Sequence, residues 1–248
     1  MMKRKVFFFA GLAVALTGCA GSGPDVFIPR PPRDLADFQV DRAAEFEAAR
    51  SEERGLPTDG TASYFGLAAF AYGAETAPGE GAPDDVTAML GEMRMRANFS
   101  ETGGTVTGDL TGFVAASGAE VRAATGVDPD AVEVPAVLEV LATGNTDWLN
   151  GEERQAVLAT FDGTVSGRID LSGDIAATGA GFPVGLVGSL QHEGKTVAIG
   201  GNAEVGFEGA EANFVWINSD PDTPGGMALT EDGAARSGVL VGVAGQPD

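Results

Sequence analysis

The sequence is poor in the residue types that carry most protein chemistry. Its 248 residues include one cysteine and one histidine. A single cysteine excludes an intramolecular disulfide framework and a cysteine-based metal cluster. A chain of this size without disulfides must be stabilised by its hydrophobic core.

Positive charge is also scarce. Fifteen Lys and Arg residues stand against 36 Asp and Glu residues, which gives a formal charge of −21. A field of that sign repels phosphate backbones, so the sequence predicts no nucleic-acid binding. The acidic residues are scattered along the chain. This favours a solvated acidic surface over a face that is specific for a basic protein partner, although both interpretations stay open.

Long apolar runs are absent, and the clearest uncharged run is Val6–Leu16 (VFFFAGLAVAL) at the N-terminal end. It is shorter than the roughly 20 residues that a membrane-spanning helix needs. Lys3, Arg4 and Lys5 precede it. A basic start followed by a short apolar run predicts a secretory signal peptide over residues 1–18.

The only cysteine follows this run, in the stretch Leu16-Thr17-Gly18-Cys19. The stretch resembles the lipobox of bacterial lipoproteins. The resemblance implies that Cys19 receives a diacylglyceryl group and becomes the new N-terminus, and Ala20 after it implies the outer membrane. Two or more acyl chains anchor a protein stably. Loss of the signal leaves 12 basic and 36 acidic residues, a charge of −24.

Residues 19–60 differ in composition from the rest. Glycine and proline come first, and the highly charged segment Arg33–Arg54 follows. The proline-rich part is expected to be extended. For residues 34–54, a short, loosely docked helix and a solvated linker are both open. We therefore expect a flexible N-terminal tether that holds the domain at 61–248 away from the membrane.

The domain at 61–248 has the texture of an antiparallel β-sheet. In the run 90–99, Met93, Met95, Ala97 and Phe99 alternate with polar residues, which is typical of a strand with one buried face. A turn at 100–104 and a second run at 105–113 complete a predicted hairpin. Further hairpins are predicted at 156–171 and 186–200. Other strands are predicted at 64–73, 203–207, 212–217 and 239–243.

Many of the 37 glycines fall inside these runs, where glycine usually marks bulges, bends or close backbone approach. Short strands with such bends favour closure of the sheet. The predicted fold class is all-β, an antiparallel barrel of approximately eight strands. Residues 128–151 interrupt the pattern, and 135–142 (PAVLEVLA) predicts a short helix, with a strand as the alternative. We expect this insertion to pack on, or plug, an end of the barrel.

Four stretches carry a family resemblance: YFGLA at 64–68, ANF at 97–99 leading to GTVTG at 104–108, FEG at 207–209, and SGVLVGV at 237–243. They resemble the barrel domain of transferrin-binding protein B-like surface lipoproteins, a group that includes factor H-binding protein. The resemblance implies a lipid anchor, a flexible tether and a single eight-stranded barrel that acts as a binding module.

No catalytic constellation is visible. His192 lies in a predicted turn without a cysteine or serine partner nearby, so we expect a surface histidine and no enzymatic activity. The clusters Asp128-Pro129-Asp130 and Asp220-Pro221-Asp222 lack the glutamate and central glycine of a calcium loop, so they predict turns. No metal or cofactor is expected.

Two tryptophans are candidate ligand contacts. Trp216 alternates with Phe214 in a predicted strand, which favours a core position, whereas Trp148 lies in a loop and is the better surface candidate. The expected function is that of a cell-surface, outer-membrane lipoprotein that binds a protein or small ligand at its barrel loops. The alternative is a periplasm-facing structural or envelope-assembly lipoprotein.

Overall fold

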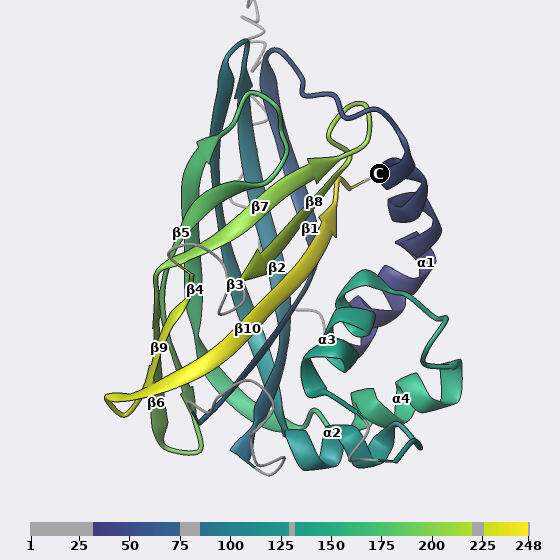
Figure 1. Ribbon diagram of the computed structural model, residues 1–248, viewed down its shortest axis with the longest axis vertical. Helices are drawn as coiled ribbons and strands as arrows, with labels where there is room; N and C mark the ends of the chain where they lie inside the picture. The colour runs from purple at the N-terminus through teal and green to yellow at the C-terminus, as the bar shows by residue number, and fades with distance from the viewer. Residues whose placement is uncertain (1–31, 75–84, 129–131, 220–225, 248) are drawn as a thin grey trace, which may run out of the picture.

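The computed structural model describes residues 32–74, 85–128, 132–219 and 226–247, and these ranges hold four helices and ten strands (Figure 1). The helices are α1 (Pro32–Ser51), α2 (Gly118–Ala124), α3 (Val134–Thr143) and α4 (Gly151–Ala159). The strands are β1 (Gly60–Ala74), β2 (Thr87–Ser100), β3 (Gly103–Ser117), β4 (Gly163–Ile175), β5 (Phe182–His192), β6 (Lys195–Gly200), β7 (Asn202–Glu208), β8 (Phe214–Ser219), β9 (Ala228–Glu231) and β10 (Ala234–Gly245).

The strands form one closed antiparallel barrel. Neighbours in sequence pair from β1 to β5, and β1 also pairs with β10, which closes the sheet. Strand β5 pairs with β7 along its first half and with β6 along its second half. In the same way β10 pairs with both β8 and β9. The short strands β6 and β7 together take one position in the barrel, and β8 and β9 together take another. Ten strands therefore make eight positions, and the predicted eight-stranded barrel is confirmed.

The barrel interior is filled by apolar side chains. Met93, Met95 and Phe99 of β2 point into it, as the alternation in the sequence predicts. The Phe207 ring packs against two other rings, and its centroid lies 5.5 Å from that of Phe99 and 5.8 Å from that of Phe182. An eight-stranded barrel is just wide enough for side chains to fill its centre.

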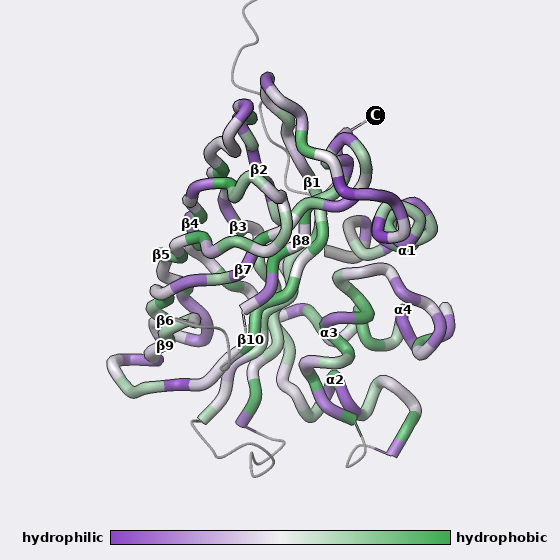
Figure 2. Tube along the Cα trace, turned by 45° about the horizontal axis from the view of Figure 1, so that its top comes forward, coloured by the Kyte–Doolittle hydropathy of each residue, from purple (hydrophilic) through white to green (hydrophobic). Residues whose placement is uncertain are grey.

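The helices form a second layer on one side of the barrel. They cover the outer faces of β1, β2 and β10, so β1 is buried on both faces from Gly66 to Tyr72. Figure 1 shows the layer on the right of the barrel, and Figure 2 shows hydrophobic segments where α3 faces β1 and β10.

Within the insertion at 128–151, the structure has the helix α3. Pro135 lies in its first turn, and Gly144 ends it with a φ of 73°. The predicted location at an end of the barrel is wrong: α3 packs on the side wall, against β1 and β10. The reason is its apolar stripe, since Val137, Leu138 and Leu141 are fully buried against that wall.

Of the two alternatives for 34–54, the structure shows a helix, α1, that is packed against the barrel. The Phe46 ring lies 5.5 Å from the Phe214 ring, and the Gln39 side-chain amide donates to the Val243 carbonyl oxygen. The Arg42 guanidinium lies 4.8 Å above the Phe214 ring and donates to the Gln246 carbonyl oxygen. Residues 19–31, which include Cys19, lie outside the described residues.

The predicted strand at 156–161 is wrong, because residues 151–159 form α4. The Asn150 side chain accepts hydrogen bonds from the backbone of Glu152 and Glu153, and the Glu153 side chain accepts from the Asn150 backbone. This capping box begins a helix before the apolar residues at 156–158 can continue as a strand. The other predicted strands and the hairpin at 186–200 are present in the barrel.

Candidate binding groove

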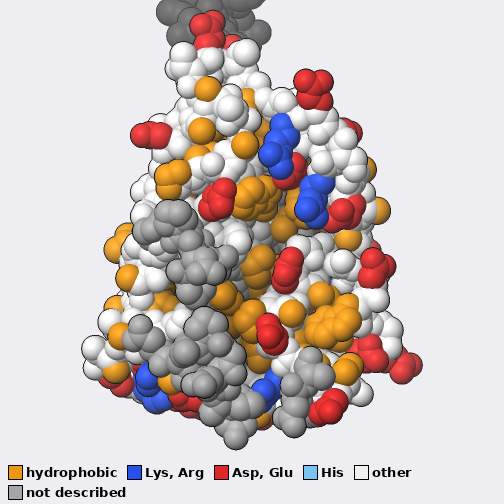
Figure 3. Space-filling model, in the orientation of Figure 1, with side chains coloured by type: hydrophobic (Ala, Val, Ile, Leu, Met, Phe, Trp, Pro, Cys, Tyr) orange, Lys and Arg blue, Asp and Glu red, His pale blue; other side chains and the backbone are white. Residues whose placement is uncertain are grey.

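A groove of about 590 Å³ lies on the outer surface of the barrel, between the helices α1 and α3 and the strands β8 and β10. Figure 3 shows hydrophobic side chains gathered in a hollow on this face, with basic side chains toward its upper part and acidic ones along its edges. The described lining is Phe46, Arg50, Arg54, Glu133, Pro135, Ala136, Glu139, Thr143, Glu208, Trp216, Ile217, Asn218, Val239, Val241, Gly242 and Val243.

Strand β10 supplies much of the apolar floor. Leu240 and Ala244 point into the barrel, so the alternating residues Val239, Val241 and Val243 point outward. The helices leave Val239 and Val241 half-buried, whereas Val243 is only 3% exposed because α1 packs on it through Phe46. Outward side chains at every second position place these valines in one row along the strand.

Trp216 of β8 extends this floor beside Val243, its cross-strand neighbour. Its indole lies against the backbone of Gly206, where a Cβ would stand 2.5 Å from Trp216 Cζ2. The ring can therefore rest flat on the sheet only because position 206 has no side chain. The predicted core position of Trp216 is wrong, since Val215 and Ile217 point inward and the tryptophan is half-buried on the outer face.

A buried carboxylate holds one end of the groove together. Glu208 of β7 is 4% exposed and accepts two hydrogen bonds from Arg54, Nη2 to Oε1 at 2.7 Å and Nε to Oε2 at 2.8 Å. Trp216 Nε1 donates to the same Oε1 at 3.1 Å. These bonds compensate the burial of the Glu208 charge, and the hydrogen bond to Glu208 raises the pKa of Arg54.

Charge is distributed unevenly along the groove. At the α1 end, the side chains of Arg54 and Arg50 are 44% and 55% exposed. Along the α3 side, the lining includes the exposed carboxylates of Glu133 and Glu139. The groove thus has two arginines at one end, Arg54 paired with Glu208 and Arg50 with Glu47, valines and Trp216 in its floor, and carboxylates along one side.

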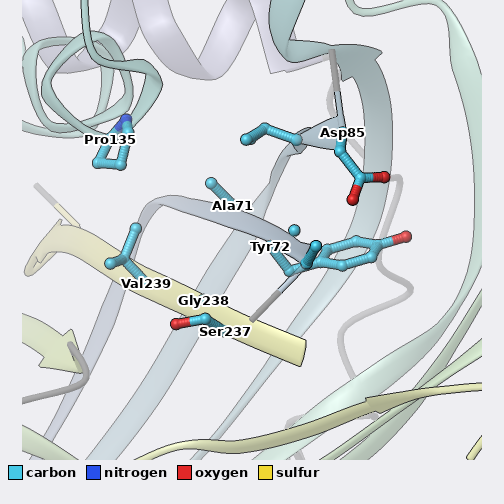
Figure 4. Close-up of a pocket in the computed structure, with 10 residues that line it drawn as sticks. Ala71, Tyr72, Asp85, Pro135, Ser237, Gly238 and Val239 are labelled. Carbon is cyan, nitrogen blue, oxygen red and sulfur yellow. The ribbon is translucent and has the colours of Figure 1, made fainter. Parts of the chain in front are cut away.

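The groove continues into a smaller pocket of about 180 Å³, because Pro135 and Val239 line both. In Figure 4, Pro135 of α3 lies across the opening from Ala71 of β1 and Val239 of β10. From Val243 at one end to Ser237 at the other, the two spaces follow β10 for six residue steps, roughly 20 Å at 3.3 Å per residue.

The structure places the sequence-predicted candidates apart from one another. Trp148 is 40% exposed in the loop between α3 and α4, and His192 is half-buried at the end of β5 with Nδ1 3.3 Å from the Thr164 carbonyl oxygen. Neither lines the groove. Asp128 is exposed, whereas residues 129–130 and the Asp220-Pro221-Asp222 cluster lie outside the described residues.

Two other features are absent from the residues that the structure describes. No group of three or more His, Cys, Asp or Glu side chains is arranged to hold a metal ion. No described helix is both long enough and apolar enough to cross a membrane. The described lining of the groove lacks histidine, serine and cysteine, and it includes Thr143 and three glutamates.

Sequence reasoning missed most of the groove. Arg50 and Arg54 lie in the segment predicted to be a tether, and Glu208 stands out only as part of the FEG stretch at 207–209. The alternation of Val239, Val241 and Val243 was visible, but only the pairing of β10 shows that these valines face outward.

Comparison of the chain with protein-family models, with curated proteins and with solved structures gives no match.

Proposed function

We propose that the protein is a lipoprotein of the outer membrane, anchored through Cys19, and that its barrel is a non-enzymatic binding module exposed at the cell surface. The observation that carries the binding role is the open groove on the outer wall, which has valines and Trp216 in its floor and charged side chains at its edges. The proposed ligand is a protein segment or a small molecule.

The barrel interior favours an external site. Buried side chains such as Phe70, Phe113 and Phe207 fill the centre, where some eight-stranded barrels hold a ligand. The groove volume of about 590 Å³ is within the range of ordinary ligand sites, roughly 300–1,000 Å³. A ligand can therefore bind outside without rearrangement of the core.

The anchor is supported by the position of Cys19, directly after a basic start and an apolar run. It is tested by growing cells with labelled palmitate. The wild-type chain should incorporate the label and Cys19→Ser should not, whereas the neighbouring change Ala20→Ser should keep it. An unlabelled wild-type chain, or a labelled Cys19→Ser chain, would contradict the anchor.

Surface exposure is tested separately, with a broad-specificity protease added to intact cells. We expect degradation of the described domain without lysis. Complete protection until lysis would favour the alternative, a periplasm-facing structural or envelope-assembly lipoprotein.

A further inference from the structure

We propose that the groove binds a long-chain fatty acid, with the carboxylate at the Arg54 end and the acyl chain along Val243, Val241 and Val239 toward Pro135. This inference rests on the proposed function, because it takes the groove to be the binding site. It adds the chemical class of the ligand and the orientation of the ligand in the groove.

The floor matches an acyl chain in chemistry and length. Val239, Val241 and the face of Trp216 present apolar atoms, and the indole N–H already donates to Glu208. Val243 beside them is almost fully covered, and Asn218 of β8 adds one polar side chain to the lining. The path of roughly 20 Å along β10 accommodates a long alkyl chain. Burial of each methylene is favourable, so a chain that fills the path binds without any hydrogen bond along its length.

The end of the groove near α1 matches a carboxylate. Arg54 uses Nε and Nη2 for Glu208, and its Nη1 takes part in neither bond. Arg50 lines the same end and is 55% exposed, with its Nη1 donating to Glu47 Oε1 at 3.1 Å. A guanidinium held in place by one buried carboxylate is preorganised to donate to a second one. Glu133 and Glu139 on the α3 side repel a carboxylate, which sets the direction of the ligand.

The backbone of β10 disfavours a peptide occupant. From Leu240 to Gly245 this strand pairs with β8 on one side and with β1 on the other. An added strand therefore finds no free backbone groups there, and strand addition depends on such groups. A sugar is disfavoured because valine side chains offer its hydroxyl groups no hydrogen-bond partner. A second copy of the chain is disfavoured by the repulsion between two molecules of charge −24.

Tryptophan quenching tests the inference. Trp148→Phe leaves Trp216 as the only tryptophan, and the full-length lipidated protein is reconstituted in phospholipid nanodiscs. Dibromostearate is the probe, because bromine quenches an indole that it touches. We expect saturable quenching of Trp216. The absence of saturable quenching would overturn the inference, and it would leave the palmitate-labelling and protease results unaffected.

Further changes in the same background locate the ligand. Val241→Asp, which adds a charge to the floor, and Val241→Phe, which fills the groove without a charge, should both abolish saturable quenching. The matched change Val187→Asp, on an exposed residue of β5, should leave the quenching unchanged. Equal quenching in the Val241 and Val187 variants would show partition into the bilayer only and would overturn the proposal.

The head group is tested with Arg54→Gln and with a brominated fatty alcohol. Loss of a charge-assisted hydrogen bond should raise the Kd of the acid about tenfold. The alcohol should bind the wild type about tenfold more weakly than the acid and should not respond to Arg54→Gln. An alcohol that binds the wild type as tightly as the acid would overturn the assignment of the carboxylate to Arg54.

Discussion

The two sides of the barrel are built from similar strands but are covered differently. On the side formed by β4, β5 and β6, buried and exposed residues alternate, and Val187 of β5 is 65% exposed. On the side formed by β1, β2 and β10, both faces are buried along much of β1 and β2 because the helices cover the outer face. We call these the open wall and the covered wall.

The residues on the covered wall explain the difference. The outward side chains Leu67, Ala69 and Ala71 of β1 are small or apolar, and this allows α3 to lie close to the sheet. The helical layer leaves Trp216 of β8 half-buried, and the groove lies at that border. The proposed binding site is the part of the covered wall that the helices leave open.

The largest expected effect is a difference in the free energy of unfolding between a substitution on the covered wall and one on the open wall. Leu138 of α3 is fully buried against the covered wall. Leu138→Ala should lower the free energy of unfolding by about 2–5 kcal/mol, since it removes buried methyl groups and leaves a cavity. Val187→Ala on the open wall should change it by less than about 0.5 kcal/mol. Urea unfolding of both variants measures this, and equal losses would mean that the helical layer is not packed as described.

A second, smaller effect concerns two arginines. Arg154 of α4 is 3% exposed, and its Nη2 donates to the Ala36 carbonyl oxygen at 2.7 Å and to the Leu141 carbonyl oxygen at 3.3 Å. It therefore joins α4 to α1 and α3. Arg154→Met leaves buried carbonyl groups without these donors and should cost about 1–3 kcal/mol.

Arg168 on the open wall is the control. Its Nε lies 3.1 Å from Asp170 Oδ1, and both side chains are largely in solvent. Arg168→Met should cost less than about 1 kcal/mol. Hydrogen exchange should show faster exchange in α1 for Arg154→Met only. Unchanged exchange in α1 would show that Arg154 does not hold the helical layer together.

The smallest expected effect is a pH dependence at the lower end of the barrel. Burial alone would raise the pKa of Glu231, but hydrogen bonds from Arg236 and Lys195 outweigh it and hold the pKa below the usual value of 4.5. A lowered pKa stabilises the folded state above pH 4.5, and this contribution is lost as the pH falls through the folded pKa.

Glu231→Gln should therefore flatten the pH dependence of stability below about pH 4.5. Asp170→Asn, in the exposed pair of the open wall, should leave that dependence unchanged. Urea midpoints between pH 3 and pH 7 measure the difference. If the two variants and the wild type have the same profile, Glu231 is not stabilised by its two cations.

The sequence predicted the barrel better than its covering layer. Alternation in β2, with Met93 and Met95 inside, is a local property that depends on the period of two in a strand. The helix α4 was missed because 156–161 is short and apolar, and the deciding Asn150–Glu153 cap lies upstream of it. Short apolar runs suit both a strand and a buried helix, so periodicity cannot separate them.

By itself the sequence predicted most of the barrel strands and the chemical context of Cys19, and it narrowed 135–142 to a helix or a strand, because each depends on residues that are neighbours along the chain. Only the tertiary structure decided that α1 packs on the barrel, that Trp216 faces outward, and that Arg54 meets Glu208. These contacts join residues from distant parts of the chain, and the closure of β1 on β10 brings them to one wall. The groove belongs to this second group, since its floor, the two arginines at its end and the carboxylates along its side come from separate segments.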